Sequence, residues 1–346
     1  MTLNREVWED PEKLLHKFDS NEDAALDFEE FCILCGELFG AEEVEEHEYR
    51  IRDIFDILDS NGDGLLNEDE WGRCHKEWIS VVLNPLSVLL VVDVQNDFID
   101  GTMALRNCGK GEDGADVIEP INQLLKEVQW KKVVYSLDWH PETHIGFYDN
   151  LHMRELHPDS KVSKEDAKIL DTVLFLEPQL EQRLWPRHCV MDTWGAQLHK
   201  ELYIIPDSSQ IRKGQNPDME TYSVFFDNNA INSTELLNIL QEIGITDVYV
   251  CGLAYDVCVR ATCMDGLRLG YRLAIIEDCC RGVDPDDVIE ARKMISENGG
   301  LLTNSKEVPM LVSGEKRSLI MAQQGTWSLA KKWSACEKEA EKESKE

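Results

Sequence analysis

Three residues, each placed at the end of an expected strand, could together carry out nucleophilic chemistry. Cys258 lies in Val-Tyr-Val-Cys-Gly-Leu-Ala-Tyr-Asp-Val-Cys-Val-Arg (248–260), where an apolar strand pattern ends at Gly252 and a helical pattern begins near Asp256. Unpaired N–H groups in the first turn of a helix favour a thiolate. A cysteine in this context is also a common small core residue, so Cys258 alone does not establish a site.

Asp93 and Lys213 supply the charged groups that a thiol nucleophile needs. Asp93 ends the apolar run Val-Leu-Leu-Val-Val (88–92), which is typical of a strand buried on both faces of a parallel sheet. Lys213 ends a further strand in Ser-Gln-Ile-Arg-Lys-Gly, where its ammonium group could stabilise a thiolate. Because open α/β sheets bind ligands beyond the carboxyl ends of their strands, we predict that Asp93, Lys213 and Cys258 form one catalytic site.

Asp138, His140 and His188 could hold a divalent transition metal. Asp138 follows the strand pattern Val-Val-Tyr-Ser-Leu, and His140 comes two residues later, so one extended chain could aim both side chains at one ion. His188 would complete a set of two imidazoles and one carboxylate that leaves positions open for water and a nitrogen ligand. By spacing alone, Asp138 and His140 could equally be loop residues that bond to the backbone. Zinc is the expected ion, and iron and manganese are compatible.

Five segments in order closely resemble nicotinamidases of the isochorismatase-like hydrolase superfamily. They are Val-Asp-Val-Gln-Asn-Asp-Phe (92–98), Asp-Trp-His-Pro (138–141), Trp-Pro-Arg-His-Cys-Val (185–190), Arg-Lys-Gly (212–214) and Gly-Leu-Ala-Tyr-Asp-Val-Cys-Val (252–259). The resemblance covers roughly residues 86 to 312. Its second and third motifs separate nicotinamidases from members of the superfamily that lack a metal, so the resemblance favours the metal interpretation.

The resemblance also implies a binding pocket for a flat aromatic ring. Phe98 and Trp185 match positions that sandwich the pyridine ring in the family, and Tyr222 matches a third wall. Taken singly, each could be an ordinary core aromatic. His144 matches a position that adds a metal ligand in some relatives, and here it could instead orient a bound water.

A mechanism follows from these implied roles. Asp93 would accept the thiol proton while Lys213 stabilises the sulfur, which attacks the carboxamide carbon of nicotinamide. A cis peptide before Ala254 is a family feature, and it would turn the N–H groups of Ala254 and Cys258 toward the developing oxyanion. Hydrolysis of the thioester would give nicotinate, with ammonia as the other product, at the entry to NAD salvage. The alternatives are hydrolysis of another small amide, or a calcium-dependent adaptor whose hydrolase domain only scaffolds partners.

The first 84 residues have a different character and predict calcium binding. They hold 24 acidic against 7 basic side chains, a net charge of −17, out of −32 for the whole chain. The segment 59–70 has the pattern of a 12-residue EF-hand loop, with Gly64 at the turn. The expected Ca²⁺ ligands are Asp59, Asn61, Asp63, the carbonyl of Leu65, and Glu70.

A second loop of the same pattern, residues 19–30, lies forty residues earlier. Ala24 occupies its turn position, where a positive φ is far easier for glycine. We therefore expect a paired EF-hand lobe in which the first loop binds calcium weakly or not at all.

The pattern of elements predicts an α/β fold with a doubly wound, mostly parallel sheet and helices on both faces, preceded by a small all-α EF-hand domain. We expect a helix at about 115–128 and strands at 132–138, 248–251 and 273–277. The predicted divisions are 1–84 for the EF-hand pair, 85–330 for the hydrolase domain and 331–346 for a charged tail that is frayed or disordered. Residues 150–183 could form a cap near the pocket.

Composition limits the partners. The strong negative charge argues against nucleic-acid binding. No apolar stretch approaches ~20 residues, and no charged start precedes an apolar region, so we expect neither a membrane span nor a secretory signal. The 11 cysteines are odd in number and lack the regular spacing of a disulfide framework. We therefore expect a cytoplasmic enzyme, which could also be present in the nucleus. The expected small-molecule partner is the substrate nicotinamide. The sequence is compatible with both a monomer and a homo-oligomer.

Overall fold

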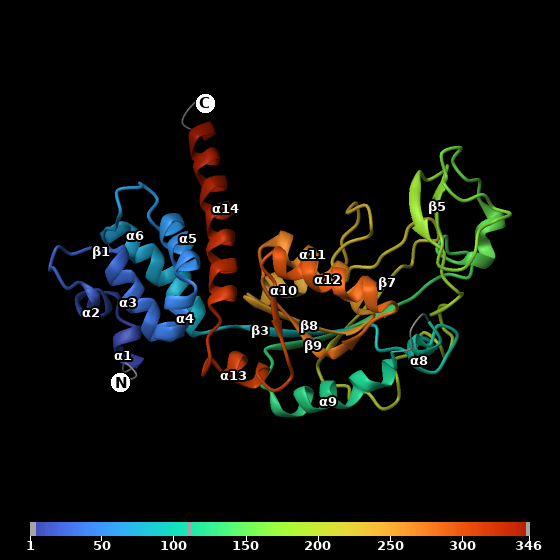
Figure 1. The fold of residues 1–346 in the computed structure, drawn as a ribbon, viewed down its shortest axis with the longest axis horizontal. Coiled ribbons are helices and arrows are strands. Elements are labelled where there is room, and N and C mark those ends of the chain that lie inside the picture. Colours follow the sequence, from blue (N-terminus) through green and yellow to red (C-terminus); the bar gives the residue numbers. More distant parts are fainter. Residues whose placement is uncertain (1–4, 109–111, 344–346) are drawn as a thin grey trace.

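The computed structural model describes residues 5–108 and 112–343 and arranges them as a helical lobe, an α/β domain and a long helix between the two (Figure 1). The lobe spans the first helices of the chain, and the α/β domain begins at β3. Among the described residues, no helix is both long and apolar enough to cross a membrane.

A parallel sheet forms the centre of the α/β domain. Within the described residues it has six strands in the order β10-β9-β8-β3-β4-β7, all paired in parallel. The strands are β3 (Ser87–Val92), β4 (Lys132–Asp138), β7 (Ser209–Lys213), β8 (Asp247–Leu253), β9 (Arg272–Arg281) and β10 (Leu301–Thr303). Every residue of β3 and β8 is buried, as expected of central strands. The predicted α/β class with a parallel sheet is confirmed.

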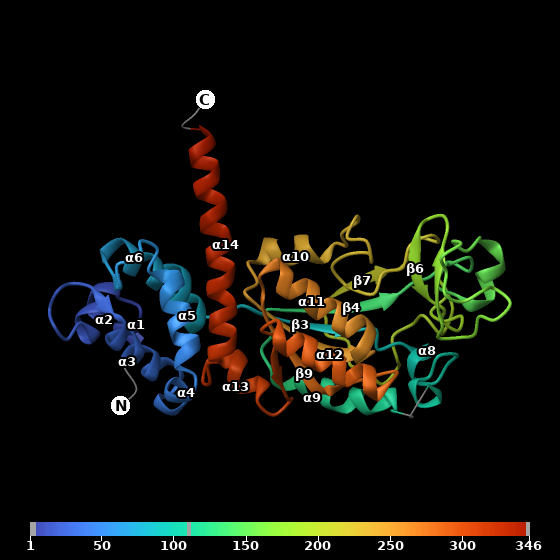
Figure 2. The same cartoon turned by 45° about the horizontal axis from the view of Figure 1, so that its top comes forward.

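Helices cover both faces of this sheet. α9 (Ile118–Glu127) lies on one face, with α13 (Val308–Ser313) against it, and α11 (Arg260–Leu269) and α12 (Pro285–Glu297) lie on the other (Figures 1 and 2). α12 starts where the side chain of Asp284 accepts the Asp286 N–H, with Pro285 at the first helical position. The shorter helices of the domain are α8 (Asn96–Ile99), α10 (Leu236–Ile243) and the 3₁₀ turns Leu105–Asn107, Gly114–Val117 and Tyr148–Met153.

The N-terminal lobe pairs two loops through a short antiparallel ladder. β1 (Leu26–Asp27) and β2 (Leu65–Leu66) bond across the two acidic loops, with Leu26 opposite Leu66. The helices are α1 (Arg5–Trp8), α2 (Pro11–Phe18), α3 (Phe28–Phe39), α4 (Ala41–Glu46), α5 (Glu48–Leu58), α6 (Glu68–Arg73), a π-helix (Cys74–Ile79) and α7 (Ser80–Leu83). Buried aromatics such as Phe31, Phe55 and Trp78 fill its separate core.

Helix α14 (Leu319–Glu343) contacts both the lobe and the sheet. Toward the sheet, the side-chain amide of Gln324 accepts from the Leu273 N–H and donates to the Leu273 carbonyl. Toward the lobe, the Trp78 indole donates to the Ala322 carbonyl, and Leu319 joins the core of the lobe. The helix runs without a break through the predicted boundary between residues 330 and 331, and residues 344–346 of the predicted tail lie outside the described part.

Residues 150–183 form a small subdomain at the other end of the sheet. β5 (Thr172–Phe175) and β6 (Leu180–Arg183) make an antiparallel hairpin. Beneath it lies a separate apolar cluster of Ile145, Leu151, Ala167, Val173, Phe175, Leu180, Leu184 and Met219. The Gln182 amide of this hairpin donates to Glu220 Oε2 at 3.2 Å, which joins the subdomain to the site described next.

Candidate active site

The predicted catalytic residues meet at the carboxyl edge of four neighbouring strands. Asp93 follows β3, Asp138 ends β4, Lys213 ends β7, and Cys258 lies in the π-helical turn Tyr255–Val259 after β8. All four are buried, with at most 5% of any of them exposed. Parallel strands bring their carboxyl ends to one edge, so residues far apart in sequence become neighbours there.

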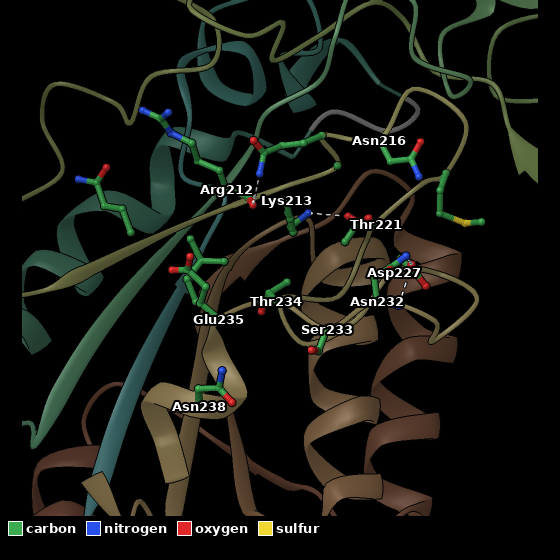
Figure 3. A pocket seen from close by; sticks show the side chains of 15 residues that line it. Arg212, Lys213, Asn216, Thr221, Asp227, Asn232, Ser233, Thr234, Glu235 and Asn238 are labelled. Atoms are coloured by element: carbon green, nitrogen blue, oxygen red, sulfur yellow. Dashed lines mark hydrogen bonds between the residues drawn. The ribbon is translucent and has the colours of Figure 1, made fainter. Parts of the chain in front are cut away.

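Lys213 is the centre of this group. Its Nζ lies 3.4 Å from Cys258 Sγ and 2.9 Å from Asp93 Oδ2, the latter as an ion pair rather than an aligned hydrogen bond. It also donates to Asp138 Oδ1 at 2.5 Å. A further bond, drawn in Figure 3, runs to the Thr221 carbonyl at 3.1 Å. One ammonium group therefore contacts the thiol, the predicted base and the first predicted metal ligand.

The charges around Cys258 favour a neutral thiol. Burial raises the pKa of Cys258 well above its usual range; Lys213 opposes this effect, and the carboxylates of Asp138 and Asp93 add to it. This differs from the thiolate expected from the helical turn alone, because the sulfur is buried and the two carboxylates beside it oppose the ammonium group. Burial also raises the pKa of Asp93 to about 6, against the effect of Lys213. A carboxyl group with that pKa accepts a proton readily near neutral pH.

The predicted metal ligands also converge. Asp138, His140 and His188 each offer one ligand atom, and these atoms lie within 4.8 Å of one another. Asp138 Oδ2 faces both imidazoles, at 3.6 Å from His140 Nε2 and 3.9 Å from His188 Nε2, while Oδ1 faces Lys213. The two carboxylate oxygens thus serve different neighbours.

Backbone carbonyls orient the two imidazoles. His140 Nδ1 lies 2.9 Å from the Gly214 carbonyl, and His188 Nδ1 lies 2.7 Å from the Pro186 carbonyl. A carbonyl at Nδ1 requires a proton there, which leaves Nε2 as the free electron pair of a metal ligand. Burial would raise the pKa of Asp138, but Lys213 and then His140 hold it well below its usual range. Two imidazoles and one carboxylate fit a divalent transition metal.

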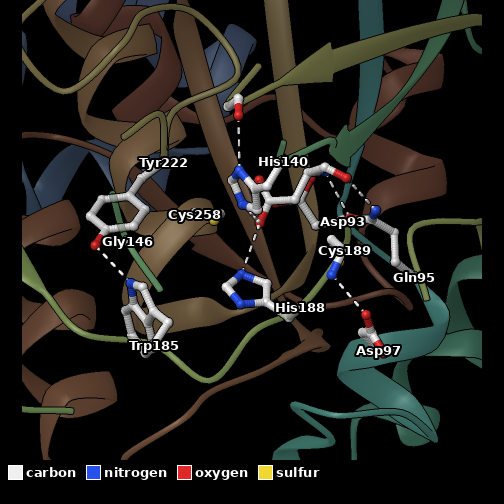
Figure 4. Close-up of polar contacts among 12 residues, drawn as sticks. Asp93, Gln95, Asp97, His140, Gly146, Trp185, His188, Cys189, Tyr222 and Cys258 are labelled. Carbon is white, nitrogen blue, oxygen red and sulfur yellow. Dashed lines mark hydrogen bonds and ion pairs between the residues drawn. The ribbon is translucent and has the colours of Figure 1, made fainter. Parts of the chain in front are cut away.

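Aromatic side chains line a narrow pocket beside the thiol. Phe98, Trp185 and Tyr222 border it together with Ala254 and Cys258. The Trp185 indole donates to the Tyr222 hydroxyl at 3.0 Å, which fixes both rings (Figure 4). The peptide bond between Leu253 and Ala254 is cis, as the resemblance implied. The oxyanion role of the Ala254 and Cys258 N–H groups stays a prediction.

A larger open cleft of about 690 Å³ lies on the other side of Lys213, beside the edge strand β7 (Figure 3). Amide and hydroxyl side chains such as Asn216, Asn232 and Ser233 line it. Neither the thiol nor the predicted metal ligands line this cleft, so the chemistry belongs to the narrow pocket.

Comparison with known proteins assigns the α/β domain. A family model described as the isochorismatase domain matches residues 87–307, which is well over half of the chain. The chain belongs to the isochorismatase family. The match starts at β3, so the helical lobe lies outside it.

Several relatives of this isochorismatase domain are nicotinamidases. The nicotinamidase of Escherichia coli (strain K12) is 34% identical over 223 residues, which cover 63% of this chain and 94% of that protein. A solved Acinetobacter baumanii nicotinamidase is 33% identical with a TM-score of 0.55, covering 64% of this chain and 98% of that one. The yeast nicotinamidase bound to the inhibitor nicotinaldehyde is 28% identical with a TM-score of 0.51, covering 63% and 99%.

Glu220 is a residue of the isochorismatase domain that the sequence did not single out. It is buried, and its Oε1 lies 3.9 Å from His144 Nε2. The ring of His144 in turn packs against the ring of His140. Burial would raise the pKa of Glu220, but His144 and His140 lower it, while burial lowers the pKa of His144 to about 4. His140, His144 and Glu220 form a second ligand group that shares His140 with the first. The only sequence signal was its position two residues before Tyr222.

Proposed function

We propose that this protein is a nicotinamidase, which hydrolyses nicotinamide to nicotinate and ammonia and thereby supplies NAD salvage. One observation carries the proposal: Cys258 borders the same aromatic pocket as Asp138 and His188, and Lys213 behind it contacts both the Cys258 sulfur and the Asp93 carboxylate. A thiol beside a base performs acyl transfer. Metal ligands at the edge of a flat aromatic pocket favour an amide whose ring carries a nitrogen that the metal could bind. The relatives named nicotinamidase support this choice of substrate.

The protein groups divide the reaction between them. Asp93 takes the proton from Cys258 as the sulfur attacks the carboxamide carbon, which avoids a free thiolate between two carboxylates. The ammonium group of Lys213 stabilises the negative charge that develops on sulfur. Asp93 then gives the proton to the departing nitrogen. Ammonia departs, and a thioester remains on Cys258. Asp93 next takes a proton from water as the water attacks the thioester, and returns that proton to the departing sulfur. The thiol is restored, and the acid product loses its proton to solvent as nicotinate.

Asp138, His140 and His188 would hold the metal ion, with zinc the expected ion. When bound, the ion supplies a Lewis acid for the pyridine nitrogen and so positions the ring. Phe98, Trp185 and Tyr222 would contact the ring, and the N–H groups of Ala254 and Cys258 would bind the oxyanion.

The test is ammonia release from nicotinamide by the purified protein, before and after treatment with a chelator. We expect release that falls on chelation and returns with zinc, iron or manganese. No release from the metal-loaded protein would contradict the proposal. A parallel assay with ureido acids and aliphatic carboxamides addresses the alternative of another small amide, which lacks a ring nitrogen for the metal.

The adaptor alternative is disfavoured by α14. Adaptor lobes of this kind bind a target helix in an apolar groove. Here Leu319 and Ala322 belong to the core of the lobe, and Leu329 and Trp333 pack against it. The chain's own helix thus fills the apolar face that a target helix would need.

We also propose that the second loop of the lobe binds Ca²⁺. Asp59, Asp63 and Glu70 place ligand atoms within 4.8 Å of one another, and Asn61 and the Leu65 carbonyl would complete the set. Glu70 is 3% exposed and caps the start of α6. Gly64 has a φ of 86°, whereas Ala24 in the first loop is forced to a φ of 65°, at a cost of roughly 1–2 kcal/mol for a residue with a Cβ. This asymmetry favours one dominant site.

Calorimetric titration of the full chain with Ca²⁺ tests the calcium proposal. We expect one tight site that Glu70→Gln removes. The variant has no negative charge and only one oxygen at this position, so it cannot bind Ca²⁺ through two carboxylate oxygens. Glu30→Gln is the matched control at the same position of the first loop and should leave the tight site intact. Two equal tight sites in the wild type, or loss of the tight site in both variants, would overturn the asymmetry.

A further inference from the structure

The ends of β3 and β4 are joined by two reciprocal side-chain contacts. Ser136 of β4 reaches the residue that follows β3, and Gln95, just after β3, reaches the end of β4. Both side chains are buried, with exposed fractions of 1% and 0%. The partner of Ser136 is the base Asp93, and the partner of Gln95 is the metal ligand Asp138.

Ser136 holds both the backbone and the side chain of Asp93. Its hydroxyl donates to Asp93 Oδ1 at 2.6 Å and accepts from the Asp93 N–H at 3.2 Å, and its carbonyl accepts from the same N–H at 3.3 Å. Asp93 has a φ of 49°, in the left-handed region that residues with a Cβ seldom occupy. A residue in such a conformation needs its surroundings to fix it, and Ser136 supplies that restraint.

Gln95 holds only the backbone of Asp138. Its Oε1 accepts from the Asp138 N–H at 2.9 Å, and its Nε2 donates to the Asp138 carbonyl at 2.8 Å and to the Ala196 carbonyl at 2.9 Å. All three bonds are buried. The amide therefore clamps the peptide groups on both sides of Asp138, and so sets the direction from which its carboxylate faces His140 and His188.

We propose that Ser136 and Gln95 are positioning residues with separable effects, given the function proposed above. Ser136 aims the Asp93 carboxylate at the thiol, so it governs the chemical step. Gln95 aims the Asp138 carboxylate at the imidazoles, so it governs metal affinity. Neither side chain lines the pocket, and each acts through the residue that it holds.

The first experiment compares Ser136→Ala with Ser136→Thr, which keeps the hydroxyl. Losing a hydrogen bond to a charged group corresponds to about a ten- to hundredfold effect, so Ser136→Ala should lower kcat by that factor with KM and metal content unchanged. Ser136→Thr should restore most of kcat. Ser87→Ala is the matched control, since Ser87 is also buried but lies at the opposite end of β3. An unchanged kcat in Ser136→Ala, or an equal fall in Ser136→Thr or Ser87→Ala, would overturn the role of Ser136.

The second experiment measures zinc affinity of Gln95→Met by competition with a chromophoric chelator. A supporting residue behind a metal ligand typically contributes about 10- to 100-fold in affinity, and we expect a loss of that size. With saturating zinc, kcat should remain close to that of the wild type. Gln95→Glu, which keeps the length and one acceptor, provides a second variant if Gln95→Met does not fold, and it should show a smaller loss.

The outcomes separate this inference from the proposed function. Wild-type zinc affinity in both Gln95 variants would overturn the role of Gln95, as would a zinc loss in Ser136→Ala equal to that in Gln95→Met. If the metal-loaded wild type releases no ammonia from nicotinamide, the proposed function fails and the kinetic half of the inference fails with it. The zinc measurement does not depend on the substrate and still decides the role of Gln95.

Discussion

Replacing Lys213 with methionine tests how strongly one buried ammonium group supports the site. The change keeps an unbranched side chain of similar length and removes the charge. The side chain of Lys213 is fully buried and contacts Asp93, Asp138 and Cys258. Its loss leaves two buried carboxylates without their shared cation.

The expected magnitude follows from that geometry. Removing one partner of a buried ion pair typically costs about 3–5 kcal/mol. At ~2–4 °C per kcal/mol for a domain of this size, the melting temperature should fall by roughly 6–20 °C. Because Lys213 lowers the pKa of Asp93, which burial raises to about 6, its removal should leave Asp93 protonated near neutral pH. Without an available base, kcat should fall by at least about 100-fold.

Thermal melting and nicotinamide hydrolysis measure the two effects. In Lys213→Met, the acid limb of the pH profile should move to higher pH. Adding Asp93→Asn should recover part of the melting temperature only at pH values high enough to ionise Asp93, because an uncompensated charge is removed only there, and it should recover none of the activity. Lys132→Met is the control, since its exposed ammonium donates only to the Asp207 carbonyl among the described residues. A Lys213→Met protein with wild-type stability and activity would refute the reasoning.

Three further outcomes are expected. In the wild type, kcat/KM should decline as the pH falls through about 6, because Asp93 is the base and burial raises its pKa to that value; a profile that is flat from about pH 5 to 8 would exclude this role. His188→Ala should raise KM for nicotinamide, and benzamide, which lacks the ring nitrogen, should be a poor substrate for the wild type; equal turnover of both amides would argue against metal binding of the ring. Calcium at 100 times its Kd should stabilise the lobe by about 2.7 kcal/mol in melting experiments, and Glu70→Gln should abolish that shift; an undiminished shift in the variant would place the ion elsewhere.

Local patterns were sufficient to predict the strands that carry the site. The predicted strand at 132–138 coincides with β4, and the apolar run before Asp93 is β3, because a strand buried on both faces must be apolar throughout. The helix expected at 115–128 is divided into a 3₁₀ turn and α9. The polar residue that ends each run then falls at the carboxyl edge of the sheet.

Features that depend on contacts between distant segments could not be predicted in this way. α14 contacts both the α/β domain and the N-terminal lobe: Gln324 bonds to β9, and Trp327 bonds to Asp53 of α5. Because two of its faces are covered, its sequence shows no single apolar stripe. Glu220 lies in a loop without periodicity, and only folding brings it beside His144. The raised pKa of Cys258 depends first on burial and then on the carboxylates of neighbouring strands, which the local turn does not reveal.

The most direct test of the central claim is the formation of nicotinate by Cys258→Ala, followed chromatographically against the wild type. Cys263→Ala is the matched control, because Cys263 is buried a short distance along the same helical segment and belongs to the hydrophobic core. The wild type and Cys263→Ala should form nicotinate, and a folded Cys258→Ala should form none. Nicotinate formation by Cys258→Ala at a rate near that of the wild type would contradict a cysteine nucleophile.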